Sequence, residues 1–266
     1  MNTSSAIKRV VELDTDNVIQ LRVVNGELTK RKKIRYNKDG TVDKRHSNRV
    51  SGVSSEVYPF TSEEEIKAMI DVFNRKIEES TNNNQKMIAC RNKMLFLIGI
   101  NLGIRASDLC GLKYNFFLNN DGTFKEHYSL QPKKTKKTGK FVKLYFNQVV
   151  KKAIADYIEE YPIEDTNEYL FKSRKGDNSI SEHALWDILD KAATEAGIEQ
   201  NIGSHSLRKT FGRFVFHNAD DKNKALVILQ TIFNHSSPAV TSRYIGLTDD
   251  EVSNVFNNLD LGLDYI

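Results

Sequence analysis

Two residues with the chemistry of a reaction site, His235 and Tyr244, stand nine positions apart. Between them lie two serines, a proline and a threonine, which are typical of a helix end, a turn and a new helix start. A tyrosine hydroxyl is a poor nucleophile at neutral pH, because its ordinary pKa is about 10. It needs proton removal and a target whose negative charge is neutralised. By itself, such a tyrosine is more often an ordinary residue of an amphipathic helix.

A glycine turn precedes an arginine at the predicted start of a helix, in Leu102-Gly-Ile-Arg105-Ala-Ser-Asp108. There the guanidinium could bind a phosphate beside the free N–H groups of the helix. Asp108, three residues later, could hold the guanidinium in place. The alternative is an ordinary salt bridge on a surface helix.

His205 and Arg208 form a His-x-x-Arg pair, with Ser204 as the predicted N-cap of their helix. Residues at positions i and i+3 share a helix face, so both side chains are expected to point at the same object. That arrangement suits an anion better than a hydrophobic core. The pair is common by chance and is weak evidence alone.

Six lysines and no acidic residue stand at the tip of a predicted β-hairpin. A lysine on a hairpin can reach into a groove and donate a proton, while its neighbours follow the phosphate backbone. The alternative is a turn that only improves solubility. The six are Lys133, Lys134, Lys136, Lys137, Lys140 and Lys143.

These clusters follow the order Arg, Lys, His-x-x-Arg, His, Tyr over 140 residues. The chain therefore resembles the tyrosine recombinase (phage integrase) family over roughly residues 58–260. The resemblance is carried by Leu-Gly-Ile-Arg-Ala-Ser-Asp-Leu, Lys-Thr-Gly-Lys, His-Ser-Leu-Arg-Lys-Thr and Asn-His-Ser-Ser-Pro-x-x-Thr-x-x-Tyr-Ile-Gly. Each segment is weak by itself, but the combination is specific.

The resemblance implies a role in DNA cleavage for each residue of the pattern. Tyr244 would be the nucleophile, and His205 would assist proton handling. The scissile phosphate would be bound by Arg105, Arg208 and His235.

The resemblance also implies that the lysine-rich hairpin supplies the general acid for the leaving 5′ oxygen. Lys137 fits the register of the family, with Lys134 as the alternative. Asp108 would support the first arginine. DNA contacts are expected from Lys133, Lys134, Lys136 and Lys140.

This chemistry requires neither a metal nor a cofactor. Two arginines and a histidine around one phosphate would stabilise the added charge of a five-coordinate transition state, a task that Mg²⁺ performs elsewhere. A covalent phosphotyrosine conserves the bond energy for rejoining, and the chain has no Gly-x-x-x-x-Gly-Lys-Ser/Thr loop. The acidic run 249–251 fits the first turn of a helix, and the six histidines have no cysteine partners at zinc spacings.

The composition indicates a globular chain of one large domain plus a smaller appendage. The 266 residues are 39% hydrophobic and 28% charged. The longest apolar run, 94–104, is too short to span a bilayer, and no signal-peptide core is seen at the N-terminus. Neither of the two cysteines lies in a Cys-x-x-Cys spacing, so a reducing cytoplasm is expected.

Positive charge is concentrated in residues 29–50, where nine basic residues face two acidic ones. The formal net charge is +4, so this segment contributes +7 and the remainder about −3. Such a basic arm would displace counterions from phosphates, and the alternative is a solvated tail. The DNA-binding candidates in the arm are Lys30, Arg31, Lys32 and Lys33.

The expected fold class is α+β, mainly α-helical, with a small antiparallel β-sheet inserted between helices. Apolar periodicity and capping residues predict the helices, and turn residues separate the strands. Helices are expected from about 61 to 77, 85–102, 106–112, 148–160, 181–196, 204–217 and 222–234, with a small one after Tyr244. Strands are expected near 18–24, 114–118, 124–130 and 141–146.

Two parts of unequal size follow from this pattern. Residues 1–57 are expected to form a basic arm and linker, too short and polar for the core-binding domain that family members commonly carry. Residues 58–266 would be the catalytic domain, with a C-terminal tail from about 249. That tail could dock on a neighbouring subunit or pack on its own domain.

The function predicted is a site-specific integrase of a phage or other mobile element, acting through a 3′-phosphotyrosyl intermediate. The alternatives are a type IB topoisomerase-like relaxing enzyme and a catalytically silent DNA-binding regulator. A plain RNA- or DNA-binding module fits least well. The expected partners are double-stranded DNA, further copies of the chain in a tetramer and an accessory DNA-bending protein.

Overall fold

The computed structural model describes residues 21–24, 27–30, 56–134, 139–174 and 176–247. The chain divides into two units, Met1–Glu56 and Val57–Ile266. In the first unit, β1 (Leu21–Val24) and β2 (Glu27–Lys30) form an antiparallel pair. Arg31, Lys32 and Lys33 lie outside the described residues, so the DNA-gripping role of the arm stays a prediction.

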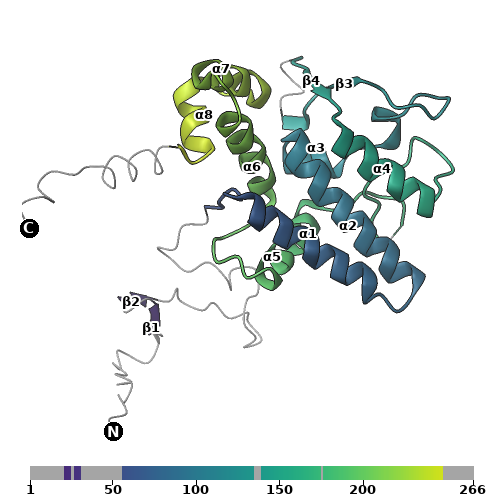
Figure 1. Cartoon of the computed structure of the whole chain (residues 1–266), viewed down its shortest axis with the longest axis horizontal. Coiled ribbons are helices and arrows are strands. Elements are labelled where there is room, and N and C mark those ends of the chain that lie inside the picture. Colours follow the sequence, from purple (N-terminus) through teal and green to yellow (C-terminus); the bar gives the residue numbers. More distant parts are fainter. Residues whose placement is uncertain (1–20, 25–26, 31–55, 135–138, 175, 248–266) are drawn as a thin grey trace, which may run out of the picture. The chain divides into compact units, whose positions relative to one another are not determined.

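The described part of the second unit is mostly helical, with one small antiparallel sheet, as the sequence predicted (Figure 1). A single turn of 3₁₀ helix covers Tyr114–Phe116. The strands are β3 (His127–Leu130) and β4 (Val142–Tyr145). The helices are α1 (Glu63–Glu78), α2 (Asn83–Leu102), α3 (Ala106–Cys110), α4 (Gln148–Glu160), α5 (Glu182–Glu195), α6 (Ser204–His217), α7 (Lys222–Phe233) and α8 (Pro238–Tyr244).

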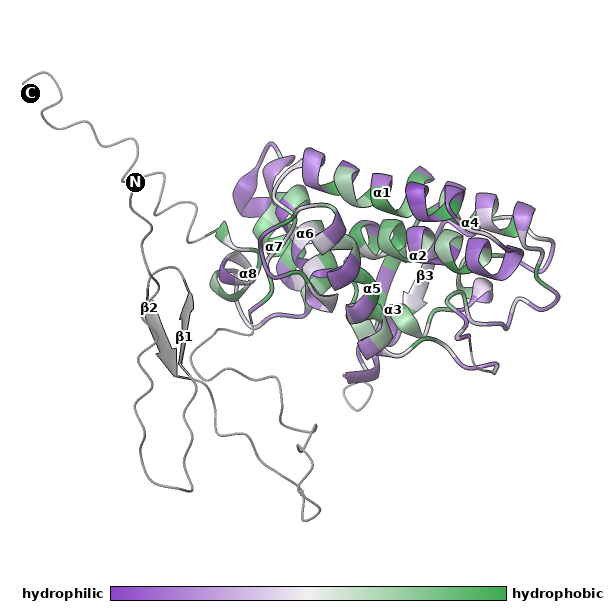
Figure 2. Ribbon diagram, turned by 90° about the horizontal axis from the view of Figure 1, so that it is seen from below, coloured by the Kyte–Doolittle hydropathy of each residue, from purple (hydrophilic) through white to green (hydrophobic). Residues whose placement is uncertain are grey.

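Helix α2 is the central element of this unit and packs against α1, α4 and α6. The Asn82 side chain accepts a hydrogen bond from the Gln85 N–H at 3.0 Å and caps its start. Its interior places Leu95, Phe96 and Ile98 in the core. By contrast, α1 alternates between hydrophilic and hydrophobic residues along its length, as expected for a helix with one solvent face (Figure 2).

The predicted strand at 114–118 is wrong, because this segment begins with the 3₁₀ turn. Tyr114 and Phe117 are both buried. A strand would place residues three apart on opposite faces, whereas a 3₁₀ turn aligns them on one side. The Tyr114 N–H also bonds to the Glu168 carbonyl at 3.2 Å, so a segment distant in sequence holds the turn.

The predicted N-cap of α6 is also wrong. Gly203 is the N-cap, and Ser204 is already helical. The Ser206 hydroxyl accepts a hydrogen bond from the Gly203 N–H at 3.0 Å. Helix α6 therefore starts one residue earlier than an N-cap at Ser204 would imply.

The buried apolar residues form two clusters. The larger cluster is built mainly from α1 to α5, and the smaller one joins α6, α7 and α8, which lie together at one end of the unit (Figure 1). Helix α6 belongs to both, with Leu207 in the larger cluster and Phe216 in the smaller. At Gly212 a Cβ would lie 2.5 Å from Ile245, so glycine allows α6 to approach the chain after α8 closely.

Tyr244 is the last residue of α8 rather than the residue before a new helix. A small helix is predicted after Tyr244, and beyond residue 247 that segment lies outside the described residues. None of the helices described in the structure is long and apolar enough to span a membrane.

Candidate active site

Arg105 stands at the junction between α2 and α3. Gly103 ends α2 in the left-handed conformation, with φ of 59°. Two residues later, Arg105 is the N-cap of α3 and is half-buried. The predicted arrangement, an arginine at a helix start after a glycine turn, is confirmed.

Asp108 has a different partner from the one expected. It is only 4% exposed, and its Oδ1 accepts a hydrogen bond from the Lys133 backbone N–H at 2.8 Å. In the described part of the chain no ion pair joins Asp108 to Arg105. The carboxylate therefore neither holds the guanidinium directly nor forms a surface salt bridge with it. It anchors the start of the lysine-rich loop to α3.

Both described ends of the lysine-rich loop approach the other site elements. Lys133 and Lys134 are exposed, and the positive charge of Lys134 acts on His205. At the far end, the Lys140 Nζ donates to the Asn234 side-chain oxygen at 3.2 Å, next to His235. Lys136 and Lys137 lie outside the described residues, so their roles remain predictions.

Arg208 is the most enclosed positively charged group of the site, at 5% exposure. Its Nη1 donates to the Gly103 carbonyl at 2.6 Å and its Nη2 to the Phe233 carbonyl at 3.0 Å. The guanidinium also lies over the Phe233 ring, 4.2 Å from its centroid. The side chain is thus held between the end of α2 and the end of α7.

His205, one turn earlier on α6, is solvent-exposed and faces the predicted nucleophile. Its Nδ1 lies 3.4 Å from the hydroxyl oxygen of Tyr244. This contact supports the expectation that the His-x-x-Arg pair faces one object.

Tyr244 is half-buried within a group of aromatic rings. Its ring meets His235 edge to face at 5.1 Å between centroids, and Phe233 at 5.5 Å. The Lys209 ammonium lies 5.7 Å from the ring centroid. These contacts fix the ring from several sides and leave the hydroxyl beside His205.

His235 is placed by the short connection between α7 and α8. Asn234 ends α7 with φ of 52°, and the His235 N–H bonds to the Gln230 carbonyl at 3.0 Å. The imidazole Nδ1 lies 3.1 Å from the hydroxyl of Thr241. Ser237 and Pro238 then start α8, as the pattern of a helix end, a turn and a new start predicted.

Burial and positive charge shift the pKa values of the site. Burial raises the pKa of Tyr244, and the nearby charges of Arg208 and Arg105 oppose that rise. Partial loss of water around each ring, followed by the charge of Arg208, lowers the pKa values of both His205 and His235. Burial also lowers the pKa of Arg208 to about 10, so it remains a cation at neutral pH. The site therefore carries fixed positive charge, and the lowered pKa values favour the neutral form of both imidazoles.

The structure brings Arg105, His205, Arg208, His235 and Tyr244 close enough together to contact or act electrostatically on one another. Within the described residues no three histidine, cysteine, aspartate or glutamate side chains converge as metal ligands would. What the arrangement can do is bind an anion beside a tyrosine hydroxyl. The expectation that no metal or cofactor takes part remains an expectation.

Three contacts of the site were not predicted, namely those of Phe233, Lys209 and Thr241. Phe233 supplies both a carbonyl and a ring face to Arg208. Lys209 had a sequence signal, since it directly follows Arg208 in the motif. Thr241 stands three residues before Tyr244 and therefore shares a helix face with it.

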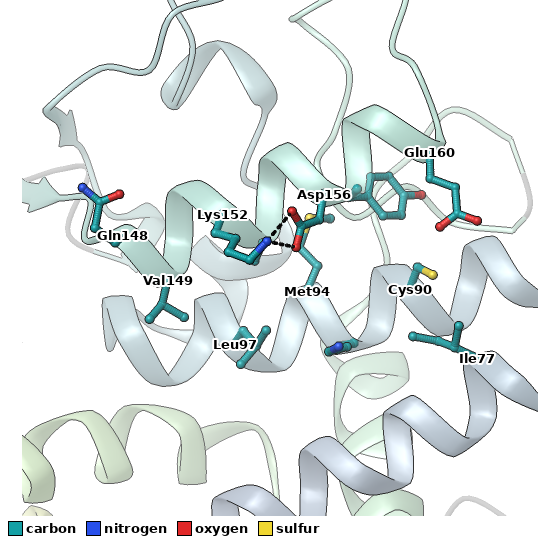
Figure 3. Close-up of a pocket in the computed structure, with 12 residues that line it drawn as sticks. Ile77, Cys90, Met94, Leu97, Gln148, Val149, Lys152, Asp156 and Glu160 are labelled. Atoms are coloured by element: carbon teal, nitrogen blue, oxygen red, sulfur yellow. Dashed lines mark hydrogen bonds and ion pairs between the residues drawn. The ribbon is translucent and has the colours of Figure 1, made fainter.

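A separate cavity of about 540 Å³ lies between α2 and α4 and contains none of the site residues (Figure 3). Met94, Leu97 and Val149 give it an apolar wall. On its rim Lys152 pairs with Asp156 at 2.9 Å, as the dashed lines show (Figure 3). The lining includes the Cys90 thiol, but burial raises the pKa of that thiol, which disfavours the reactive thiolate.

Comparisons with known proteins identify the family to which this domain is similar. The sequence model described as the Phage integrase family matches residues 59–251. The probable integrase/recombinase YoeC of Bacillus subtilis (strain 168) is 38% identical over 160 residues, which cover 60% of this chain and 80% of that protein.

Two solved structures share the fold. The crystal structure of XerA recombinase has a TM-score of 0.55 at 20% identity, covering 80% of this chain and 68% of that one. The XerH site-specific recombinase, bound to palindromic difH substrate in a post-cleavage complex, has a TM-score of 0.53 at 16% identity. There the match covers 84% of this chain and 60% of that chain.

Proposed function

The chain belongs to the phage integrase family of tyrosine recombinases, and we propose that it breaks and rejoins DNA at specific sites through a covalent bond to Tyr244. The single observation that carries the proposal is the contact between the Tyr244 hydroxyl and His205, at 3.4 Å, beside the buried Arg208. A nucleophile, a neutral base and a fixed cation thus meet at one place. The comparisons lend no support to a relaxing enzyme, a silent regulator or a plain binding module.

In the proposed reaction the Tyr244 oxygen attacks the scissile phosphorus. A bond forms between phosphorus and the tyrosine oxygen, and the bond from phosphorus to the 5′ oxygen breaks. The tyrosine proton passes to the His205 Nδ1, and the leaving 5′ oxygen takes a proton to become a hydroxyl. The product is a 3′-phosphotyrosyl diester. Attack by a 5′ hydroxyl of a second strand reverses these steps and rejoins the DNA.

Positive charge lowers the barrier to this step. Arg105 and Arg208 would bind the non-bridging oxygens of the phosphate, whose negative charge grows in the transition state. His235 would add a hydrogen bond. Because Arg208 is already held by two backbone carbonyls, little reorganisation would be needed when the substrate binds.

The proton for the leaving oxygen would come from the lysine-rich loop. We propose Lys137 as the general acid, with Lys134 as the alternative. Support comes from the described ends of the loop, which reach α3 through Asp108 and the end of α7 through Asn234.

DNA is the proposed partner, as the family implies. Assembly of four copies on two DNA sites, an accessory DNA-bending protein and an origin in a phage or mobile element are part of the same proposal. So is DNA binding by Lys133, Lys134, Lys136 and Lys140, and by the basic arm. The match spans only 60% of the XerH chain.

Covalent trapping tests the proposal. The protein is incubated without Mg²⁺ with labelled, nicked duplexes tiled across the DNA that flanks its gene. A protein–DNA band that survives denaturation is expected for the native chain and for Tyr145→Phe, which removes an exposed hydroxyl on β4. The band should be absent for Tyr244→Phe. An adduct that persists in Tyr244→Phe would reject the assigned nucleophile.

The general acid is tested with a duplex that carries sulfur at the 5′ bridging position. A thiolate leaves without a proton, so the substrate needs no general acid. Lys137→Ala should cleave ordinary DNA slowly and the sulfur substrate at nearly the native rate. If the sulfur substrate restores the cleavage rate of Lys134→Ala but not that of Lys137→Ala, Lys134 is the general acid.

A further inference from the structure

Thr241, on α8, contacts the predicted catalytic imidazole of His235 with its hydroxyl group. It is fully buried and lies one helical turn before Tyr244. Its Oγ1 is 3.1 Å from the His235 Nδ1 and 3.4 Å from the Ser237 carbonyl. A buried hydroxyl between an imidazole and a carbonyl can decide which ring nitrogen carries the proton.

The hydroxyl has a single proton and two candidate acceptors. If the proton points at the Ser237 carbonyl, as helical threonines often arrange, then the His235 Nδ1 must be protonated and donate to Thr241. If it points at the His235 Nδ1, that nitrogen is an acceptor and the ring proton sits on Nε2. The His235 contact is the shorter of the two, at 3.1 Å against 3.4 Å. The Ser237 carbonyl already accepts the Thr241 N–H at 3.3 Å.

The chemistry of the substrate favours the second arrangement. Non-bridging phosphate oxygens are acceptors only, so His235 is useful to them only through an N–H. A neutral imidazole has one N–H, and Nδ1 already faces Thr241. Burial, together with the charges of Arg208 and Arg105, lowers the pKa of His235, which favours the neutral ring.

We propose that Thr241 is a positioning residue that donates its hydroxyl proton to the His235 Nδ1 and so holds the ring as the Nε2–H tautomer. The neutral ring then presents Nε2–H to the scissile phosphate. The proposal rests on the function proposed above, since it assigns the phosphate to His235. Its first test does not depend on DNA.

The tautomer can be read directly from the ¹⁵N shifts of the imidazoles in the free protein. His235→Gln identifies the signals of this ring among the six histidines. In the native chain we expect an unprotonated Nδ1 and a protonated Nε2. Thr241→Val keeps the side-chain shape without the hydroxyl and should move the ring towards a mixture of tautomers. Thr241→Ser should restore the native pattern. A protonated Nδ1 in the native chain would overturn the proposal.

A second measurement connects the tautomer with the reaction. Thr241→Val should slow formation of the covalent adduct about tenfold with DNA affinity unchanged, and Thr241→Ser should recover most of the rate. In a His235→Gln background, Thr241→Val should not slow adduct formation further, because Thr241 acts through the His235 imidazole. If Thr241→Val lowered the rate of adduct formation equally in the native and His235→Gln backgrounds, Thr241 would not act through His235. If no adduct forms even with the native chain, the proposed function is rejected. The ¹⁵N measurement still tests the tautomer of His235, because it does not depend on cleavage.

Discussion

The Arg208 Nη1 donates a hydrogen bond of 2.6 Å to the Gly103 carbonyl, 105 residues earlier in the chain. Gly103 ends α2 and directly precedes the segment that carries Arg105. The second arginine of the predicted phosphate site is therefore tied to the backbone that positions the first. A substitution in the segment of either arginine should therefore alter the position of the other arginine.

Replacing Arg208 by lysine should separate charge from geometry. Lysine keeps the positive charge but cannot donate in two fixed directions to the carbonyls of Gly103 and Phe233. We expect the rate of covalent cleavage to fall roughly 100-fold to 1000-fold, the range found when one preorganised donor is removed from an anion site. The measurement is a single-turnover cleavage assay with nicked duplex.

Arg91→Lys is the matched control for that variant. Arg91 is also buried, at 7% exposure, and donates to the Lys172 carbonyl at 2.6 Å, but it contacts no site residue. Both substitutions should reduce the free energy of unfolding by about 1–3 kcal/mol. Only Arg208→Lys should slow cleavage. Equal effects of the two variants on cleavage would show that Arg208 acts through stability alone.

Gly103→Ala should disturb the arginine site by a steric route. A Cβ at this position would lie 2.3 Å from the Phe211 ring, and the backbone has φ of 59°. The left-handed conformation costs about 1–2 kcal/mol for alanine, and overpacking adds about 1–3 kcal/mol. We expect a marked loss of thermal stability and of cleavage.

Gly122→Ala provides the comparison, because Gly122 has φ of 82° and nothing within 4 Å of its Cβ position. It should show the backbone cost alone, with cleavage unchanged. If Gly103→Ala lost no more thermal stability than Gly122→Ala, the Phe211 ring would be able to move aside without cost.

Lowering the pH should reduce both the free energy of unfolding and the rate of cleavage, because histidines of the site become protonated. The pKa of His235 is lowered in the folded state from its ordinary 6.5, so the unfolded chain binds more protons as the pH falls. The stability that neutral His235 contributes is fully present above its unfolded pKa and is lost as the pH falls through the lowered folded value. Urea unfolding at a series of pH values across this range measures the effect. As the pH falls, the free energy of unfolding should decrease less for His235→Gln than for the native chain.

The acid limb of the cleavage rate should have its midpoint below 6.5, because the pKa of His205 is lowered too and only the neutral ring can accept the tyrosine proton. A midpoint above 6.5 would contradict the role of His205 as the proton acceptor.

Asp108→Ala should slow cleavage by releasing the start of the lysine-rich loop. The variant removes the acceptor for the Lys133 N–H, whereas Asp108→Asn retains an oxygen at the same place. We expect the alanine variant to cleave ordinary DNA about tenfold more slowly, which corresponds to one lost hydrogen bond. It should be largely rescued by the 5′ bridging sulfur substrate. A defect that sulfur does not rescue would place the action of Asp108 at the phosphate rather than at the leaving oxygen.

Much of the fold follows from local signals. Helices α4 and α6 have the predicted bounds, because Asn147 caps α4 and apolar periodicity defines both helices. The error at 114–118 has a tertiary cause, since the Tyr114 turn is held by a carbonyl more than fifty residues away. Local propensity for a strand could not register that partner.

The residues proposed for the chemistry could be named from the sequence alone, because the reaction requires particular side chains and these stand at the order and spacing of the motifs. The structure places a helix start beside two of them, with α3 beginning directly after Arg105 and α6 one residue before His205. Only the tertiary structure decided which groups hold those side chains: two carbonyls for Arg208, the Lys133 N–H for Asp108 and the Thr241 hydroxyl for His235. The partners of Arg208 and Asp108 lie 25 to 105 residues away. Thr241 lies only six residues from His235, but across a helix end and a turn. Backbone groups carry no sequence signal of their own, so packing alone brings them together.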